Sequence, residues 1–148
     1  MSKIDFDKVK KRLEELLADE ESEVRHYVNM AQRAGDPKIR AALKSIAEDT
    51  IVHYYVVKAL LESIREIEMF RRRLMEEQGE HRLEEIAANL VGHDKLESLI
   101  EAAYLDLMDI VDVGSIRAIL KVISEEEKKH SKLVKLILEM AGYKRGKK

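Results

Sequence analysis

Apolar side chains recur at alternating steps of three and four residues in four separate stretches of the chain. An average step of 3.5 residues predicts helices that pack along one seam in a left-handed bundle. Four seams of similar length predict an all-α, antiparallel four-helix bundle. The seams run from Phe6 to Ala34, from Ile39 to Ile64, from Leu83 to Val111 and from Ile116 to Ala141.

The second half of the chain repeats the first at a separation of 77 residues. Ile39-Arg40-Ala41 corresponds to Ile116-Arg117-Ala118, and His53 corresponds to His130. Because the repeated unit contains two seams, it is a helical hairpin used twice. We expect one domain, 1–148, with a first hairpin at 5–64, a connector at 65–81, a second hairpin at 82–141 and a basic tail at 142–148.

Residues that favour helix ends flank the seams. Asp36 and Pro37 suit the start of the second helix, and Ser115 suits the start of the fourth. Gly142 suits the end of the fourth helix. Gly92 predicts a break within the third stretch.

The segment from Arg65 to Gln78 lacks proline and glycine, so the second helix is expected to continue past its seam. Two equivalent hairpins in one bundle need a return connection along helices of about 30 residues, or about 45 Å. An extended connector can span this distance, whereas a helical one cannot. A helical connector would make the hairpins of two chains complete each other's bundles. We therefore expect a homodimer, with exchanged hairpins as one form of it.

Composition narrows the functions open to such a bundle. The net charge of −2 gives no field that would attract nucleic acid or an anionic membrane, and the run Arg71-Arg72-Arg73 is expected to be solvated. No apolar run is long enough for a membrane span, and the first residues are charged, so we expect a cytoplasmic protein. Without cysteine there is no thiolate zinc site or iron–sulfur centre. Any metal must therefore bind to histidine and carboxylate.

Polar residues interrupt all four seams at matching heights. Several carboxylates inside a bundle are costly unless they are protonated, paired or bound to a cation. Carboxylate and imidazole groups suit Fe(II) and Mn(II), and they can also bind Zn(II). A metal site is therefore favoured over a metal-free polar network. The interrupting residues are Glu20, Glu23, Thr50, His53, His93, Glu97, Glu127 and His130.

The motif Glu127-Lys128-Lys129-His130 places a carboxylate and an imidazole on one helix face. The pairs Glu20…Tyr27 and Glu97…Tyr104 occupy equivalent places in the two hairpins. In these residues the chain resembles, over nearly its whole length, the ferritin-like superfamily and most closely its rubrerythrin-type branch. The resemblance implies a ferritin-like bundle with two iron ions, or Mn or Zn in their place. It also implies ferroxidase- or peroxidase-type oxidoreductase activity toward O2 or H2O2, with electrons from a separate donor.

The resemblance assigns roles to individual residues. Glu20 and Glu97 would be terminal ligands, Glu127 a bridging ligand, and His53 and His130 the nitrogen ligands. The chain departs from this pattern at Thr50, which takes the place of the first bridging glutamate. Glu23 lies on the seam one turn from Glu20, and we hypothesise that it replaces the missing ligand. The alternative is a seam-edge glutamate that reaches solvent.

Three further residues lie near the predicted ligands. Tyr27 and Tyr104 resemble tyrosines that hydrogen-bond carboxylate ligands in catalytic sites of this family, and the alternative is an ordinary core tyrosine. His93 lies one turn before Glu97 but beside the expected break, so we do not expect it to bind metal.

Two other functions stay open on the sequence. Because Thr50 removes one ligand, the bundle could bind metal only for sequestration or structure, with a degenerate and redox-inactive site. A metal-free interaction module is the third reading, and the polar seam residues argue against it.

Overall fold

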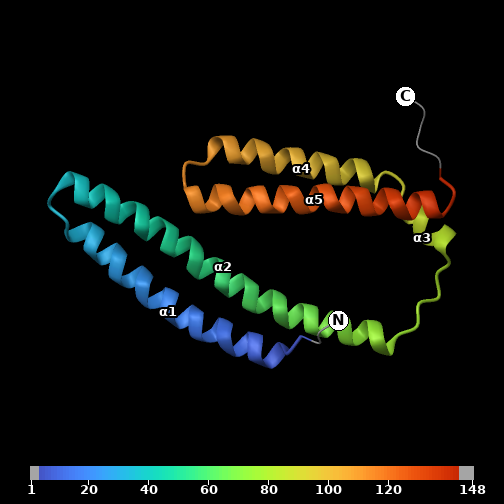
Figure 1. The fold of residues 1–148 in the computed structure, drawn as a ribbon, viewed down its shortest axis with the longest axis horizontal. Helices are drawn as coiled ribbons and strands as arrows, with labels where there is room; N and C mark the ends of the chain where they lie inside the picture. The colour runs from blue at the N-terminus through green and yellow to red at the C-terminus, as the bar shows by residue number, and fades with distance from the viewer. Residues whose placement is uncertain (1–3, 144–148) are drawn as a thin grey trace. The chain divides into compact units, whose positions relative to one another are not determined.

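The computed structural model describes residues 4–143, which form five helices and no strand. The all-α prediction is therefore confirmed for this part of the chain. The chain divides into two compact units, Met1–Gln78 and Gly79–Lys148, and each contains one long helical hairpin (Figure 1). The helices are α1 (Phe6–Arg33), α2 (Pro37–Glu76), α3 (Leu83–Leu90), α4 (His93–Ile110) and α5 (Gly114–Met140).

The first hairpin consists of α1 and α2, which lie side by side and run in opposite directions (Figure 1). Asp36 caps α2 by accepting hydrogen bonds from the backbone N–H groups of Lys38 at 2.9 Å and Ile39 at 3.1 Å. Pro37 occupies the first turn, where its missing N–H costs nothing. The predicted start of the second helix is therefore confirmed.

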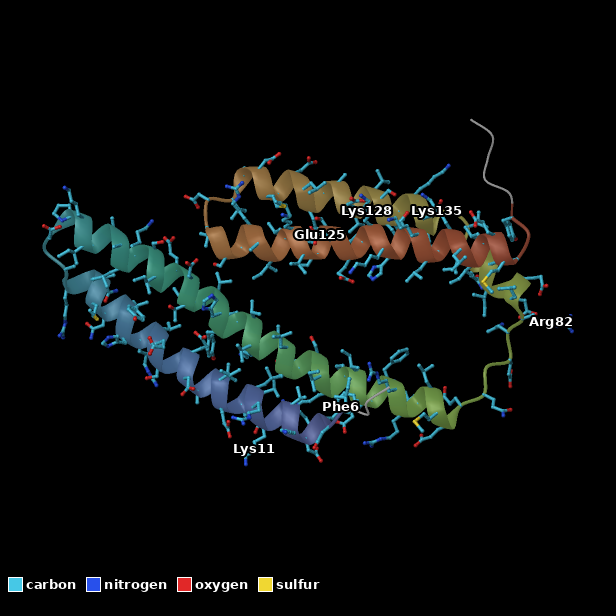
Figure 2. The ribbon with its side chains drawn as sticks, in the orientation of Figure 1. Phe6, Lys11, Arg82, Glu125, Lys128 and Lys135 are labelled. Carbon is cyan, nitrogen blue, oxygen red and sulfur yellow. The ribbon has the colours of Figure 1, made fainter. Side chains whose placement is uncertain are left out.

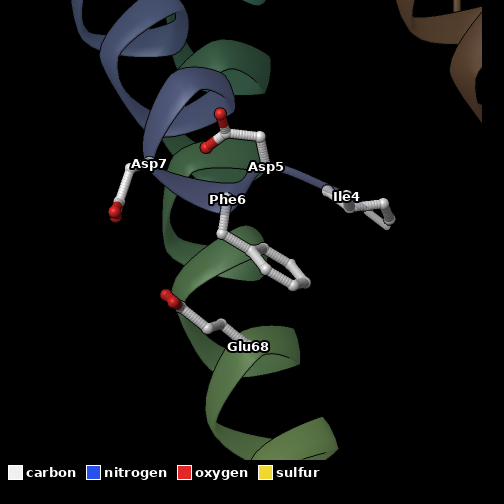
Figure 3. A pocket seen from close by; sticks show the side chains of 5 residues that line it. All are labelled: Ile4, Asp5, Phe6, Asp7 and Glu68. Carbon is white, nitrogen blue, oxygen red and sulfur yellow. The ribbon is translucent and has the colours of Figure 1, made fainter. Parts of the chain in front are cut away.

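Helix α2 continues to Glu76, well beyond the end of its seam. The first turns of α1 pack against this continuation. Lys10 Nζ lies 2.9 Å from a Glu68 carboxylate oxygen, and the Arg71 guanidinium lies 5.6 Å from the centre of the Phe6 ring. Figure 3 shows the shallow depression at this place, which is lined by Ile4, Asp5, Phe6, Asp7 and Glu68.

These contacts move the boundary of the first hairpin. The sequence placed its end at residue 64 and a connector at 65–81, but residues 65–71 pack in the hairpin and the helix ends only at Glu76. The non-helical link to α3 is confined to 77–82. The expectation that the second helix runs past its seam is confirmed.

Each helix of the first hairpin has a packed edge and an open edge. On α1, Leu17 and Val24 are half-buried, whereas Leu16 and Met30 are 47% and 41% exposed. On α2, Ala47, Thr50 and Leu61 are buried. Ile46, His53 and Leu60, on the other edge of the same helix, are exposed. We call the exposed side the open face of the first hairpin, and its members are Leu16, Glu23, Met30, Ile46, His53 and Leu60.

The second hairpin consists of α4 and α5, with the short α3 beside α5 (Figure 1). Gly92 separates α3 from α4 and has a φ of +88°, a left-handed conformation that glycine adopts without strain. The predicted break is therefore confirmed. The prediction that Ser115 caps the last helix is wrong, because α5 already begins at Gly114, after Val113.

Gly142 ends α5 as predicted. It has a φ of +85°, and its N–H donates to Glu139 O at 3.0 Å while Tyr143 N–H donates to Leu138 O at 3.0 Å. This pair of bonds satisfies carbonyls that the last turn leaves free. The basic tail that follows, residues 144–148, lies outside the described residues.

Charged side chains cover the outer surfaces of both hairpins, among them Lys11 on α1 and Lys128 on α5 (Figure 2). Among the described residues, no helix combines the length and the apolar character that a membrane crossing requires.

Candidate metal centre

Glu97, Glu127 and His130 converge between α4 and α5. Each offers one potential ligand atom, and these atoms all lie within 4.8 Å of one another. The Nδ1 atom of His130 is 3.6 Å from a Glu127 carboxylate oxygen and 3.9 Å from a Glu97 carboxylate oxygen. The two glutamate side chains are 22% and 17% exposed, and His130 is 49% exposed. The structure therefore brings together three of the six predicted ligands.

The helices explain why these three side chains meet. Glu127 and His130 are three residues apart on α5, so they project from the same face. Glu97 lies in the second turn of α4, whose start is fixed by the left-handed Gly92. We call Glu97, Glu127 and His130 the triad.

Two serines, Ser98 and Ser131, connect α4 and α5 beside the triad. Neither was predicted from the sequence. Ser131 is buried, donates a hydrogen bond to Asp94 O at 3.1 Å, and has its hydroxyl 3.4 Å from that of Ser98. Small side chains let the helix backbones approach closely. One signal was available, because Ser124 and Ser131 are seven residues apart and so share a face of α5.

The two carboxyl groups of the triad influence each other's charge. The pKa of Glu97 is raised, first because its carboxyl shares a hydrogen bond with that of Glu127. Partial burial and repulsion by the Glu127 charge raise it further, while His130 and His93 act in the opposite direction. A cation bound beside the two carboxyl groups would favour their charged form and so oppose this shift.

The first hairpin contains an equivalent but smaller group. His53 Nδ1 lies 3.9 Å from a Glu20 carboxylate oxygen, the same separation as between His130 and Glu97. Glu20 is 24% exposed and His53 is 55% exposed. The repeat that pairs Glu20 with Glu97 and His53 with His130 in the sequence is therefore also a repeat in side-chain geometry.

Thr50 occupies the position in the first hairpin that corresponds to Glu127 in the second. It is 6% exposed, and its hydroxyl donates a hydrogen bond to Ile46 O at 2.7 Å. This bond uses the hydroxyl proton within the helix, and the side chain offers no carboxylate. The first hairpin thus presents two potential ligands where the second presents three.

Glu23 is exposed and lies on the open face, together with His53. It belongs neither to the triad nor to the Glu20–His53 pair, so its role as a replacement ligand stays a prediction. His93 is exposed at the start of α4 and, among the described residues, is outside the triad.

The two predicted supporting tyrosines are half-buried. Tyr27 makes an edge-on contact with the ring of His26 at 5.3 Å, and Tyr104 lines an apolar depression on α4 with Ile100, Ala103 and Leu107. Within residues 4–143 neither phenol hydrogen-bonds to a predicted ligand. Their catalytic role stays a prediction.

No protein family, curated protein or solved structure matches this chain.

Proposed function

We propose that this chain is a ferritin-like metalloprotein that binds two divalent ions, iron in the first place, and oxidises Fe(II) or reduces peroxide or O2. The triad is the observation that carries the proposal. Two carboxylates and an imidazole with ligand atoms within 4.8 Å form a donor set that suits Fe(II), Mn(II) or Zn(II). The Glu20–His53 pair supplies a second set of the same kind.

The triad residues fit this role chemically. A cation at the triad would favour the charged form of both carboxyl groups, so Glu97 and Glu127 can both serve as ligands. His130 contributes a nitrogen with its Nδ1 or Nε2 atom and is half exposed, so it can turn toward a bound ion. When bound, a reduced metal pair supplies electrons to O2 or peroxide.

The surroundings of the triad support its geometry. Ser131 and Ser98 tie α5 to α4 next to Glu97, which limits the freedom of the helices that carry the ligands. Glu127 lies beside His130 on α5 and faces Glu97 on α4, and one potential ligand atom of each of the three lies within 4.8 Å of the others. The electrons that restore the reduced state would come from a separate donor protein or molecule.

A second candidate function is metal binding without redox chemistry. Thr50 favours it, because its buried hydroxyl bonded to Ile46 O leaves the first hairpin one ligand short. A single ion held by the triad would then serve structure or sequestration.

Metal content and reactivity test the proposal together. Protein purified without chelator would be analysed for metal, loaded with Fe(II) under argon, and exposed separately to O2 and H2O2 while near-ultraviolet absorbance is recorded. We expect two irons per four-helix unit and rapid oxidation. One inert ion per unit would favour the second candidate, and no retained metal would contradict both.

Matched variants make the test specific. Glu127→Ala removes a triad ligand, and we expect it to lose both bound iron and oxidation. Glu125→Ala removes the same charge from the same helix, at an exposed position outside the triad (Figure 2), and we expect it to behave as the wild type. Equal losses in both variants would contradict the assignment of the triad.

A further inference from the structure

We propose that two copies of this chain exchange hairpins, so that Glu20 and His53 of one copy share a metal site with the triad of the other. This inference rests on the proposed function for the site but has its own structural basis. The basis is the continuous helix α2, the short link that follows it and the apolar side chains that the described hairpins leave exposed.

The end of α2 is held helical by the first hairpin itself. Arg65 lies 3.4 Å from a Glu14 carboxylate oxygen, Lys10 pairs with Glu68 at 2.9 Å, and Phe6 lies under Arg71. Unwinding residues 65–71 into an extended connector would break all of these contacts along with the backbone hydrogen bonds of the helix. The link that remains between α2 and α3 has only six residues, 77–82.

Chain length then limits what a single copy can build. In a bundle whose two hairpins run in opposite directions, α2 would end about 34 Å beyond His53 on one side of the site. Leu83 would begin up to about 21 Å beyond Glu97 on the other side, the distance reached if α3 continued the line of α4. The link would therefore have to span from about 34 Å to about 55 Å, but the seven steps from Glu76 to Leu83 reach about 25 Å at most. One chain cannot close this bundle on itself, whereas two chains can.

A single-chain bundle with both hairpins in the same direction needs only a short link. It would leave the end of α2 uncovered. Helix α1 begins at Phe6, beside Arg71, and α3 would begin at least about 13 Å short of Glu76. Ile67, Phe70 and Leu74 form an apolar stripe there and are 40%, 59% and 62% exposed. A second copy offers the same stripe, which a two-fold axis can pair with itself.

The open face of the first hairpin also suits a partner hairpin. Leu16, Met30, Ile46 and Leu60 are 41–47% exposed there, and His53 lies among them at the same heptad spacing. A hairpin that covered this face would meet the metal ligand as well as the apolar residues. The second hairpin of another copy carries the matching ligands, so the site is incomplete without it.

Complementation between two inactive variants tests the exchange. One variant carries Glu20→Ala and His53→Ala, and the other carries Glu97→Ala and Glu127→Ala. The two would be unfolded together, refolded in equal amounts, loaded with Fe(II) and analysed for retained iron after gel filtration. Half of the dimers would be mixed and would have one intact site of two, so we expect recovery of about one quarter of the wild-type sites. Each variant refolded alone is the control and should recover none.

A longer link provides a second test that does not depend on metal. Inserting about 15 glycine and serine residues after Glu77 adds about 50 Å of reach, which allows one chain to close its own bundle. We expect light scattering to give a dimer for the wild type and a monomer for the insertion variant, with equal helix content by circular dichroism.

The outcomes separate this inference from the proposed function. A monomeric wild type, an insertion variant that stays dimeric, or no recovery in the mixture beside a metal-loaded wild type would each overturn the exchange. A wild type that retains no metal would overturn the proposed function. The molecular masses of the wild type and the insertion variant would still decide whether the hairpins exchange.

Discussion

Thr50→Glu would test whether the two hairpins differ in function by one carboxylate. Thr50 is 6% exposed and donates a hydrogen bond to Ile46 O at 2.7 Å. The substitution removes this bond, which costs about 1 kcal/mol. It also brings a carboxylate into a largely buried position. At the equivalent position Glu127 is 17% exposed, so the longer side chain partly reaches solvent and the added cost is about 2 kcal/mol rather than that of full burial.

The expected effect has opposite signs without and with metal. In chelator, the variant should lose about 3 kcal/mol of unfolding free energy, which lowers Tm by roughly 10 °C for a chain of this size. A new ligand beside Glu20 and His53 should strengthen metal binding at the first hairpin. At a free metal concentration of about 100 times Kd, binding at the new site restores about 2.7 kcal/mol, so metal should return the variant nearly to the stability of the metal-free wild type.

Thermal unfolding followed by circular dichroism, in chelator and in Mn(II), is a suitable assay because Mn(II) avoids oxidation during heating. Thr50→Gln is the matched control, since it has nearly the same size and no charge. We expect Thr50→Gln to be destabilised to a similar extent in both conditions. If metal raises the Tm of the glutamate and glutamine variants equally, the introduced carboxylate is not a ligand and the argument from a single missing carboxylate is wrong.

Three further predictions concern local structure and charge. Gly92→Ala forces a side chain into a φ of +88° and should cost about 1 kcal/mol or more; urea unfolding would measure it, and an unchanged midpoint would contradict the role of the turn. Asp36→Ala removes the cap of α2 and should cost about 1 kcal/mol, with Asp36→Asn largely retaining it. Because the pKa of Glu97 is raised in the folded chain, the metal-free protein should lose stability as the pH rises from 4.5 through that pKa, and Glu97→Gln should flatten this part of the profile.

Periodicity predicted the long helices α1, α2, α4 and α5 well because their seams are regular. The break at Gly92 and the start of α2 at Asp36 and Pro37 were also predicted, since they depend on local backbone chemistry. The extent of the first hairpin was not, because a seam of 3.5 residues says nothing about ion pairs such as that between Lys10 and Glu68. These contacts join positions far apart in the sequence.

The seam pattern also did not predict which edge of each helix packs against the other helix of its hairpin. Leu17 and Val24 were left off the predicted seam, yet they are half-buried, while Leu16 on the seam is exposed. In a bundle each helix contacts two neighbours, so its apolar stripe is wider than one seam. An average over the stripe cannot separate the two edges.

The part of the candidate site that follows from the sequence repeat was predicted. Matching positions in two hairpins predicted that Glu97, Glu127 and His130 converge, which the structure shows. That Thr50 replaces a metal ligand stays a prediction. Ser98 and Ser131 were missed because serine is common on helix surfaces and only its burial shows that it spaces the helices.

In the proposed centre, the number of bound ions depends on whether Glu23 is a ligand. The triad offers three potential ligands and the Glu20–His53 pair offers two, so a pair of ions would lack one protein ligand unless another carboxylate joined. Glu23 is exposed on the same open face as His53, where a partner hairpin would meet both side chains. Glu23→Ala should therefore reduce bound iron from two ions to one per site and abolish oxidation, because two-electron chemistry requires the pair. Glu21→Ala, which removes a neighbouring exposed charge that pairs with Arg25 at 3.8 Å, should leave both unchanged. If Glu23→Ala retains two irons and full oxidation, the site reaches its ligand count without Glu23, and Thr50 does not mark a rearranged centre.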